Sequence, residues 1–141
     1  MFVDACAIVS IMAGETTAAE YEDALLEATN PITSSLAAWE AIIVLSRPDQ
    51  LNCRYSEAEG AVIEWLDARS IQLRDAPSPR RVLSYAVAVA EKHGIGKRAL
   101  SNFDCFHYAY AKAMRQPLLT LDRLLQETDV ETYPSSVQNR K

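Results

Sequence analysis

Long apolar runs, a basic leader and a paired set of cysteines are all missing from this chain of 141 residues. No apolar segment approaches the roughly 20 residues of a membrane-spanning helix, so we expect no membrane partner. The first residues lack the positive charge of a signal peptide, and the three cysteines match neither a zinc site nor a disulfide framework. These features favour a cytoplasmic protein.

A basic excess is also missing, since the formal net charge is -5. Because phosphates attract basic surfaces, this charge taken alone argues against nucleic-acid binding. Converging carboxylates that bind a divalent cation would reverse the sign locally, so the position of the acids matters more than their number. The composition is 49% apolar and 23% charged, which is typical of one globular domain.

Strand-like and helix-like segments alternate along the chain. Short apolar runs predict strands at residues 1–4, 32–34, 71–73, 117–120 and 130–133. Helical periodicity and helix-capping residues predict helices at 6–12, 16–28, 35–46, 56–69, 77–93, 102–114 and 122–126. Ser56 and Glu59 fit a capping box at the start of one of them. This alternation predicts an α/β fold, with a central parallel sheet of four to five strands flanked by helices.

Four acidic residues lie where parallel sheets bind ligands, outside the carboxyl ends of the strands. Asp4 and Asp122 lie at or just beyond strand ends, and Glu40 and Asp104 lie in early turns of helices. Carboxylates are the ligands that Mg²⁺ and Mn²⁺ prefer, and such cations activate water for phosphodiester hydrolysis. Spacing alone leaves another interpretation open, because Asp4, Asp104 and Asp122 also suit the starts of helices.

Four short motifs give this arrangement a family resemblance. The motifs are MFVDACAIV at 1–9, SSLAAWE at 34–40, NFDCFHYA at 102–109 and LLTLD at 118–122. In order and spacing they resemble the motifs of PIN-domain proteins, and the resemblance covers nearly the whole chain. It implies a single PIN-like nuclease domain over residues 1–134, followed by a polar tail at residues 135–141.

The size of the chain and its loop at 94–97 are similar to those of VapC-type toxins from bacterial toxin–antitoxin pairs. The resemblance implies an endoribonuclease that uses Mg²⁺ or Mn²⁺ to cleave RNA, forms a homodimer and is inhibited by a separate antitoxin. The catalytic and metal-binding acids that it implies are Asp4, Glu40, Asp104 and Asp122.

Two residues depart from the family pattern. Phe103 stands where many relatives have a glycine before the third acid, and Cys6 stands where a serine or threonine is common. A thiol is a weaker hydrogen-bonding partner than a hydroxyl, so we expect Cys6 to alter the first-strand geometry or the metal affinity. All four acids are present, and we therefore expect an active enzyme.

Neighbouring residues supply auxiliary candidates. The hydroxyl of Thr120 is placed either to contact a metal-bound water or to cap the next helix. Lys97 and Arg98 precede the third motif and are candidates for RNA backbone contacts, with an ordinary solvated loop as the alternative. His107 shares a helical face with Asp104, but we expect a surface or partly buried histidine rather than a substrate contact.

Two other classes of protein fit parts of this sequence. A catalytically inactive PIN-like module that binds RNA or protein is the main alternative, and the complete set of acids argues against it. A phosphatase is disfavoured, because Cys6 rather than an aspartate lies two residues after Asp4. A receiver domain is disfavoured, because neither its acidic pair near the start nor its lysine after a late strand is evident.

The helices at 16–28 and 56–69 predict a surface for partners. Their apolar residues include Tyr21, Leu25, Val62 and Trp65, which we expect one small domain to leave partly exposed. Such a surface would form a homodimer contact, a groove for an apolar helix of the antitoxin, or both. We expect an antitoxin arginine to reach the acidic pocket, because its planar fork pairs with carboxylates.

Overall fold

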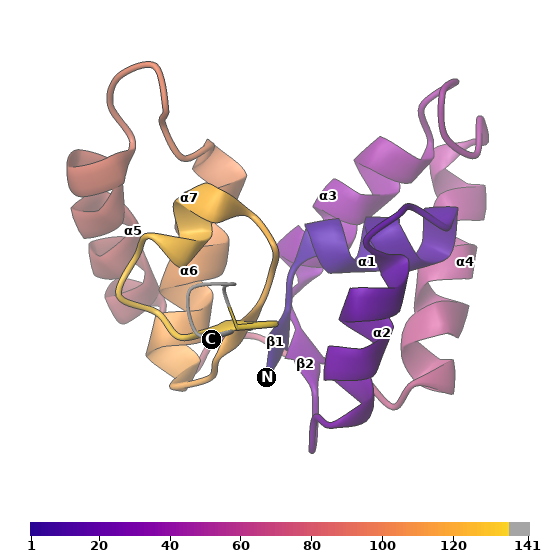
Figure 1. Cartoon of the computed structure of the whole chain (residues 1–141), viewed down its shortest axis with the longest axis horizontal. Coiled ribbons are helices and arrows are strands. Elements are labelled where there is room, and N and C mark those ends of the chain that lie inside the picture. The colour runs from indigo at the N-terminus through magenta and orange to yellow at the C-terminus, as the bar shows by residue number, and fades with distance from the viewer. Residues whose placement is uncertain (136–141) are drawn as a thin grey trace.

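The computed structural model describes residues 1–135 as five short strands and seven helices around one sheet (Figure 1). The strands are β1 (Phe2–Val3), β2 (Ile32–Thr33), β3 (Gln72–Leu73), β4 (Leu118–Leu119) and β5 (Thr132–Tyr133). The helices are α1 (Ala5–Ala13), α2 (Ala18–Leu26), α3 (Ser35–Leu45), α4 (Tyr55–Ala68), α5 (Pro79–His93), α6 (Asn102–Met114) and α7 (Arg123–Gln126). The predicted tail at 135–141 lies outside the described residues except for Ser135, so the boundary at residue 134 stays a prediction.

All strand pairs are parallel, and the strands follow the order β3-β2-β1-β4-β5. The central strand β1 pairs on both sides, with Phe2 opposite Ile32 of β2 and opposite Leu118 of β4. This confirms the predicted α/β class. It also brings the carboxyl ends of β1 and β4 together at one edge of the sheet.

Helices cover both faces of the sheet, as Figure 1 shows. Phe2 and Leu118 pack into a core with α5, α6 and α7, whereas Val3 and Leu119 pack into a second core with α1, α2, α3 and α4. Successive side chains of a strand point to opposite faces, so β1 and β4 each contribute one residue to each core. Burial on both faces explains why β1 and β4 are apolar runs rather than alternating patterns, whereas both residues of the edge strand β3 are exposed.

Polar caps fix the helices that begin at the carboxyl edge. Asp4 caps α1, Ser34 caps α3 and Ser101 caps α6, each by accepting a backbone N–H with its side-chain oxygen. At the other end of α1, Gly14 takes a left-handed conformation with φ of 67°, which favours glycine. The structure therefore confirms the predicted helices that follow Asp4 and that carry Glu40 and Asp104.

Two predictions about the outer helices are wrong. Helix α4 begins at Tyr55, one residue before Ser56, and its N-cap Arg54 makes no side-chain capping bond, so there is no capping box. Tyr21 and Val62 are fully buried rather than partly exposed, because α1 and α3 cover the inner faces of α2 and α4.

Leu25 is also buried, while Trp65 is partly buried as expected. The apolar side chains that do reach the surface are scattered over several elements, with Leu26 83% exposed and Ile95 79% exposed. None of the helices in residues 1–135 combines the length and apolar character that a membrane crossing requires.

Candidate metal centre

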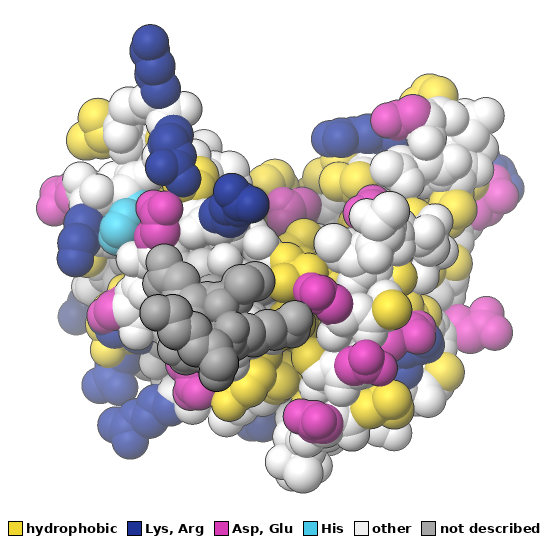
Figure 2. Space-filling view, viewed as in Figure 1, with side chains coloured by type: hydrophobic (Ala, Val, Ile, Leu, Met, Phe, Trp, Pro, Cys, Tyr) yellow, Lys and Arg dark blue, Asp and Glu magenta, His cyan; other side chains and the backbone are white. Residues whose placement is uncertain are grey.

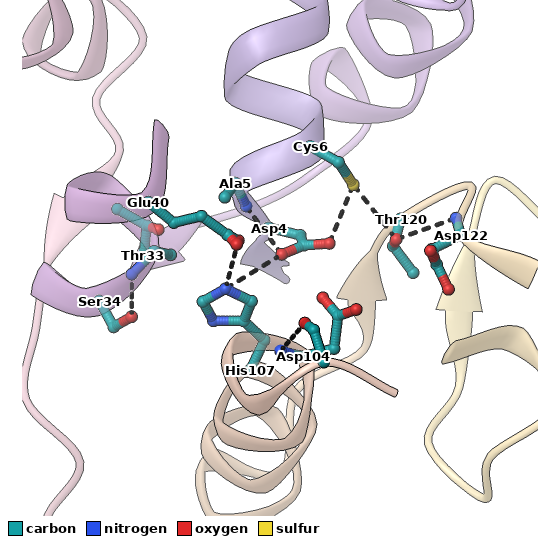
Figure 3. Close-up of polar contacts among 12 residues, drawn as sticks. Asp4, Ala5, Cys6, Thr33, Ser34, Glu40, Asp104, His107, Thr120 and Asp122 are labelled. Carbon is teal, nitrogen blue, oxygen red and sulfur yellow. Dashed lines mark hydrogen bonds and ion pairs between the residues drawn. The ribbon is translucent and has the colours of Figure 1, made fainter. Parts of the chain in front are cut away.

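Three acids and one histidine meet at the carboxyl edge of β1 and β4 (Figure 3). Asp4, Glu40, Asp104 and His107 each offer one ligand atom, and these atoms all lie within 4.8 Å of one another. Asp4 follows β1, Glu40 lies in α3, and the other two residues lie in the first turns of α6. The predicted convergence therefore involves three of the four acids, together with a histidine.

Asp4 is the buried centre of this cluster, with only 2% of its surface exposed. Its Oδ1 accepts the backbone N–H of Ala5 at 2.8 Å, and its Oδ2 accepts the thiol of Cys6 at 2.9 Å. Burial is the main cause of a raised pKa at the Asp4 carboxyl, against which His107 and the Cys6 thiol act. The protein thus holds this carboxylate rigidly but compensates its charge incompletely.

Asp104 enters the cluster from the first turn of α6. Its backbone N–H donates to the Oγ of Ser101 at 3.1 Å, which fixes the start of the helix and leaves the carboxylate free. Burial, followed by repulsion from Asp4 and Asp122, raises the pKa of Asp104 to about 6. The raised pKa reflects the cost of placing this carboxylate in a largely buried position beside two other acids.

Glu40 reaches the cluster from the opposite side, from the middle of α3. Its Oε1 lies 2.9 Å from Nε2 of His107, and the side chain is 20% exposed. The helix that carries it begins at Ser35 and is capped by Ser34, whose Oγ accepts the N–H of Ala37. The serine-capped helix inferred from the sequence therefore places its glutamate in the site.

His107 is a member of the cluster that the sequence interpretation missed. It is fully buried rather than superficial, because α6 turns the face that it shares with Asp104 toward β1. Burial opposes protonation, but the carboxylates of Asp4 and Glu40 outweigh it, and the pKa of His107 is raised. The only sequence signal was its position three residues after Asp104, which is one helical turn.

Asp122 stands at the edge of the cluster rather than inside it. It is not among the side chains whose ligand atoms gather within 4.8 Å, and Figure 3 shows it at the far end of the row from Glu40. Its Oδ1 caps α7 by accepting the N–H of Leu125 at 3.0 Å. Its charge still contributes to the raised pKa of Asp104, so the two carboxylates are neighbours.

A small hydrogen-bond network joins Asp4 to the end of β4. The Sγ of Cys6 lies 3.2 Å from Oη of Tyr21 and 3.3 Å from Oγ1 of Thr120, in addition to its contact with Asp4. Thr120 is fully buried, and its Oγ1 accepts the N–H of Asp122 at 3.1 Å. The thiol therefore donates to Asp4, and Thr120 holds the turn that leads to Asp122. The expected effect of Cys6 on strand geometry or metal affinity stays a prediction.

Lys97 and Arg98 lie in the exposed loop between α5 and α6. Gly96 precedes them with φ of 101°, a conformation that side-chain-bearing residues avoid. Arg98 pairs with Glu127 at 3.2 Å, with 70% of the Arg98 side chain exposed, so this bond links the loop to α7. The two cations lie outside the cluster, and their predicted RNA contacts stay a prediction.

The fold and the site define a class of protein: a parallel α/β domain with a cluster of acidic side chains, able to bind a metal ion, at the carboxyl edge of its sheet. The family model described as the PIN domain matches residues 1–131, and the chain belongs to the PIN-domain family.

Curated relatives support the same assignment. The chain is 26% identical to the VapC ribonuclease Mb0640 of Mycobacterium bovis, over 94% of this chain and 97% of the relative. The same values hold for ribonuclease VapC30 of Mycobacterium tuberculosis. Among solved structures, the Mycobacterium tuberculosis toxin VapC20, which is described as a sarcin-ricin loop cleaving toxin, superposes with a TM-score of 0.65. That match covers 86% of this chain and 88% of the other at 14% identity, and it supports the fold alone.

Proposed function

We propose that this chain is a metal-dependent endoribonuclease and the toxin of a toxin–antitoxin pair. The observation that carries the proposal is the convergence of Asp4, Glu40, Asp104 and His107 within 4.8 Å. Membership of the PIN-domain family supports nuclease chemistry. The names of the mycobacterial relatives, which are ribonucleases, support RNA as the substrate.

The donor set of the cluster fits a hard divalent cation. Burial, together with repulsion between neighbouring carboxylates, raises the pKa of Asp4 and of Asp104. A bound cation would stabilise the charged form of both acids and relieve that repulsion. Burial also raises the pKa of Cys6 well above its usual value, so the thiol stays protonated and donates to Asp4. The cluster offers three carboxylates, no thiolate and one imidazole, whose Nε2 already contacts Glu40, so it favours Mg²⁺ or Mn²⁺ over zinc.

Each acid has its own task in the proposed reaction. Asp4, Asp104 and Glu40 would hold the cation, and a divalent cation in such a site supplies an activated water and stabilises charge on the phosphate. One oxygen of Asp122 caps α7, and we assign the proton of the attacking water to the other. Thr120 orients Asp122 by accepting its backbone N–H.

RNA, an antitoxin and a second copy of the chain are the proposed partners. We assign RNA phosphate contacts to Lys97 and Arg98, which are exposed in the loop before Asp104. An antitoxin would bring an arginine to the carboxylates and thereby compete with the metal. A homodimer and a cytoplasmic location complete the proposal.

The alternative is a PIN-like module that binds RNA or protein without cleaving it, and one experiment separates the two functions. Purified protein is incubated with structured RNA in EDTA and then with added Mg²⁺ or Mn²⁺. Cleavage that stops in chelator and returns with either ion supports the nuclease. RNA binding without cleavage at any metal concentration would leave the binding module, and undiminished cleavage in EDTA would contradict the metal site.

A further inference from the structure

The imidazole of His107 has two aromatic rings beside it. The ring of Phe103 is stacked on it at a centroid distance of 6.3 Å and an interplanar angle of 27°. The ring of Phe2 lies at 6.0 Å and 44°. Since the side chain is also fully buried, these contacts leave the imidazole little freedom to rotate.

The fixed ring points one nitrogen at two carboxylates. Nε2 of His107 lies 2.9 Å from Oε1 of Glu40 and 3.6 Å from Oδ1 of Asp4 (Figure 3). The other nitrogen, Nδ1, is buried and has no hydrogen-bond partner within residues 1–135. A proton on Nε2 satisfies Glu40, whereas a neutral ring protonated only on Nδ1 would bury an unpaired N–H and turn a lone pair toward a carboxylate. His107 is therefore the donor in this pair.

Glu40 depends on that donor more than the other acids do. Asp4 is held by the N–H of Ala5 and the thiol of Cys6 as well as by its short side chain. Glu40 extends from α3 on a longer and more flexible side chain, and His107 is its hydrogen-bond partner within the described part of the chain. Without the imidazole, several rotamers would carry the Glu40 carboxylate away from Asp4.

We propose that His107 is a positioning residue that holds Glu40 in the cluster, so that a divalent cation meets three carboxylates already in place. This inference rests on the proposed function, because it concerns the same metal site. Partners that orient metal ligands typically contribute about 10–100-fold to metal affinity. His107 would act through Glu40 and need not touch the RNA.

Two amide variants test the position of the donated hydrogen. The amide nitrogen of glutamine in His107→Gln falls near the place of Nε2, whereas that of asparagine in His107→Asn falls near Nδ1. Binding of Mg²⁺ and of Mn²⁺ is measured by isothermal titration calorimetry on the full chain, without RNA. We expect His107→Asn to weaken metal binding about tenfold and His107→Gln to stay within about threefold of the wild type.

A double-mutant cycle with Glu40→Gln separates positioning from general structural damage. If His107 acts through Glu40, adding His107→Asn to Glu40→Gln should weaken metal binding no further. Circular dichroism and thermal unfolding of each variant verify that it is folded, and a misfolded His107→Asn is replaced by His107→Leu in the same cycle.

The results separate this inference from the proposed function. Unchanged metal affinity in His107→Asn, equal losses in the asparagine and glutamine variants, or an undiminished effect of His107→Asn beside Glu40→Gln would overturn the positioning role. Wild-type protein that binds neither cation would overturn the metal site itself, and the positioning role with it. A loss confined to His107→Asn that disappears in the double variant supports the inference.

Discussion

The two halves of this chain differ in charge as well as in position. The first 73 residues carry twelve Asp and Glu against three Lys and Arg, whereas the remaining 68 carry seven against eleven. The first half contains α1, α2, α3 and α4, and the second contains α5, α6 and α7, which lie on the opposite side of the molecule (Figure 1). Figure 2 shows Lys and Arg gathered over the α5–α7 side and Asp and Glu over the α1–α4 side.

This difference shows why the net charge of -5 misleads when it is taken alone. An acidic chain can still present a basic surface to RNA if its positive charges are gathered on one side. The candidate metal centre lies at the junction of the halves, with Asp4 and Glu40 from the acidic one and Asp104 and His107 from the basic one. Four predictions test this division of roles.

Removing one acid from each half should have the largest effect. Because even outer partners of metal ligands contribute about 10–100-fold, we expect Asp4→Asn and Asp104→Asn each to slow RNA cleavage by more than about 100-fold. The measurement is the initial rate of cleavage at saturating Mg²⁺, with Asp23→Asn on the exposed face of α2 as the control. Wild-type turnover in either variant would remove that residue from the site.

Neutralising the basic half beside the site should weaken RNA binding. Lys97, Arg98 and Arg123 are exposed and flank the site through the α5–α6 loop and the start of α7. If each contacts one phosphate of a single strand, changing all three to Gln should lower the salt slope of binding by about 2. Affinity near physiological salt should fall roughly 30-fold, measured by fluorescence anisotropy in EDTA.

A matched control lies on the same basic half. Arg80 and Arg81 are exposed at the first turn of α5, at the opposite end of that helix from the loop. Changing both to Gln also removes positive charge, but we expect the salt slope to stay near that of the wild type. Equal losses in the two sets would mean that RNA responds to total charge and not to this surface.

A change in the acidic half should alter the affinity for the antitoxin rather than the affinity for RNA. If an antitoxin arginine pairs with the carboxylates, Glu40→Gln should weaken the toxin–antitoxin complex about tenfold, because a desolvated charge pair is lost. Added Mg²⁺ should weaken the wild-type complex in the same direction. Affinity that is indifferent both to metal and to Glu40→Gln would mean that the antitoxin blocks the site sterically.

The smallest expected effect concerns stability without metal. The pKa of Asp104 is raised to about 6, so its protonated form stabilises the fold below about pH 4, and this stabilisation is lost as the pH rises through 6. Asp104→Asn should therefore raise Tm in EDTA by about 3 °C at pH 7, and the gain should vanish toward pH 4. The gain stays small because the variant also loses a favourable charge at the start of α6. A gain in Tm of the same size at pH 4 would show that the charge of Asp104 is not what destabilises the metal-free fold.

Much of the fold was predictable because its signals are local. Apolar runs and capping residues placed the strands and helices within a few residues, and Asp4, Glu40 and Asp104 were assigned to positions that converge in the structure. The capping box at Ser56 was wrong because a local motif competes with a helix start one residue earlier. The exposure expected for Tyr21, Leu25 and Val62 was wrong because periodicity marks an apolar face without identifying what covers it.

The sequence by itself determined the order of elements and the carboxylates that follow β1 and begin α6, because strand ends and helix caps depend on neighbouring residues. Only the tertiary structure decided which side chains share the centre. The packing of α6 against β1 and α3 brings His107 beside Phe2 and within reach of Glu40, whereas Phe103 is already its neighbour one turn away on α6. Asp122 stays at the edge because its oxygen caps α7. Distances between residues far apart in the chain arise from packing, and no local pattern encodes them.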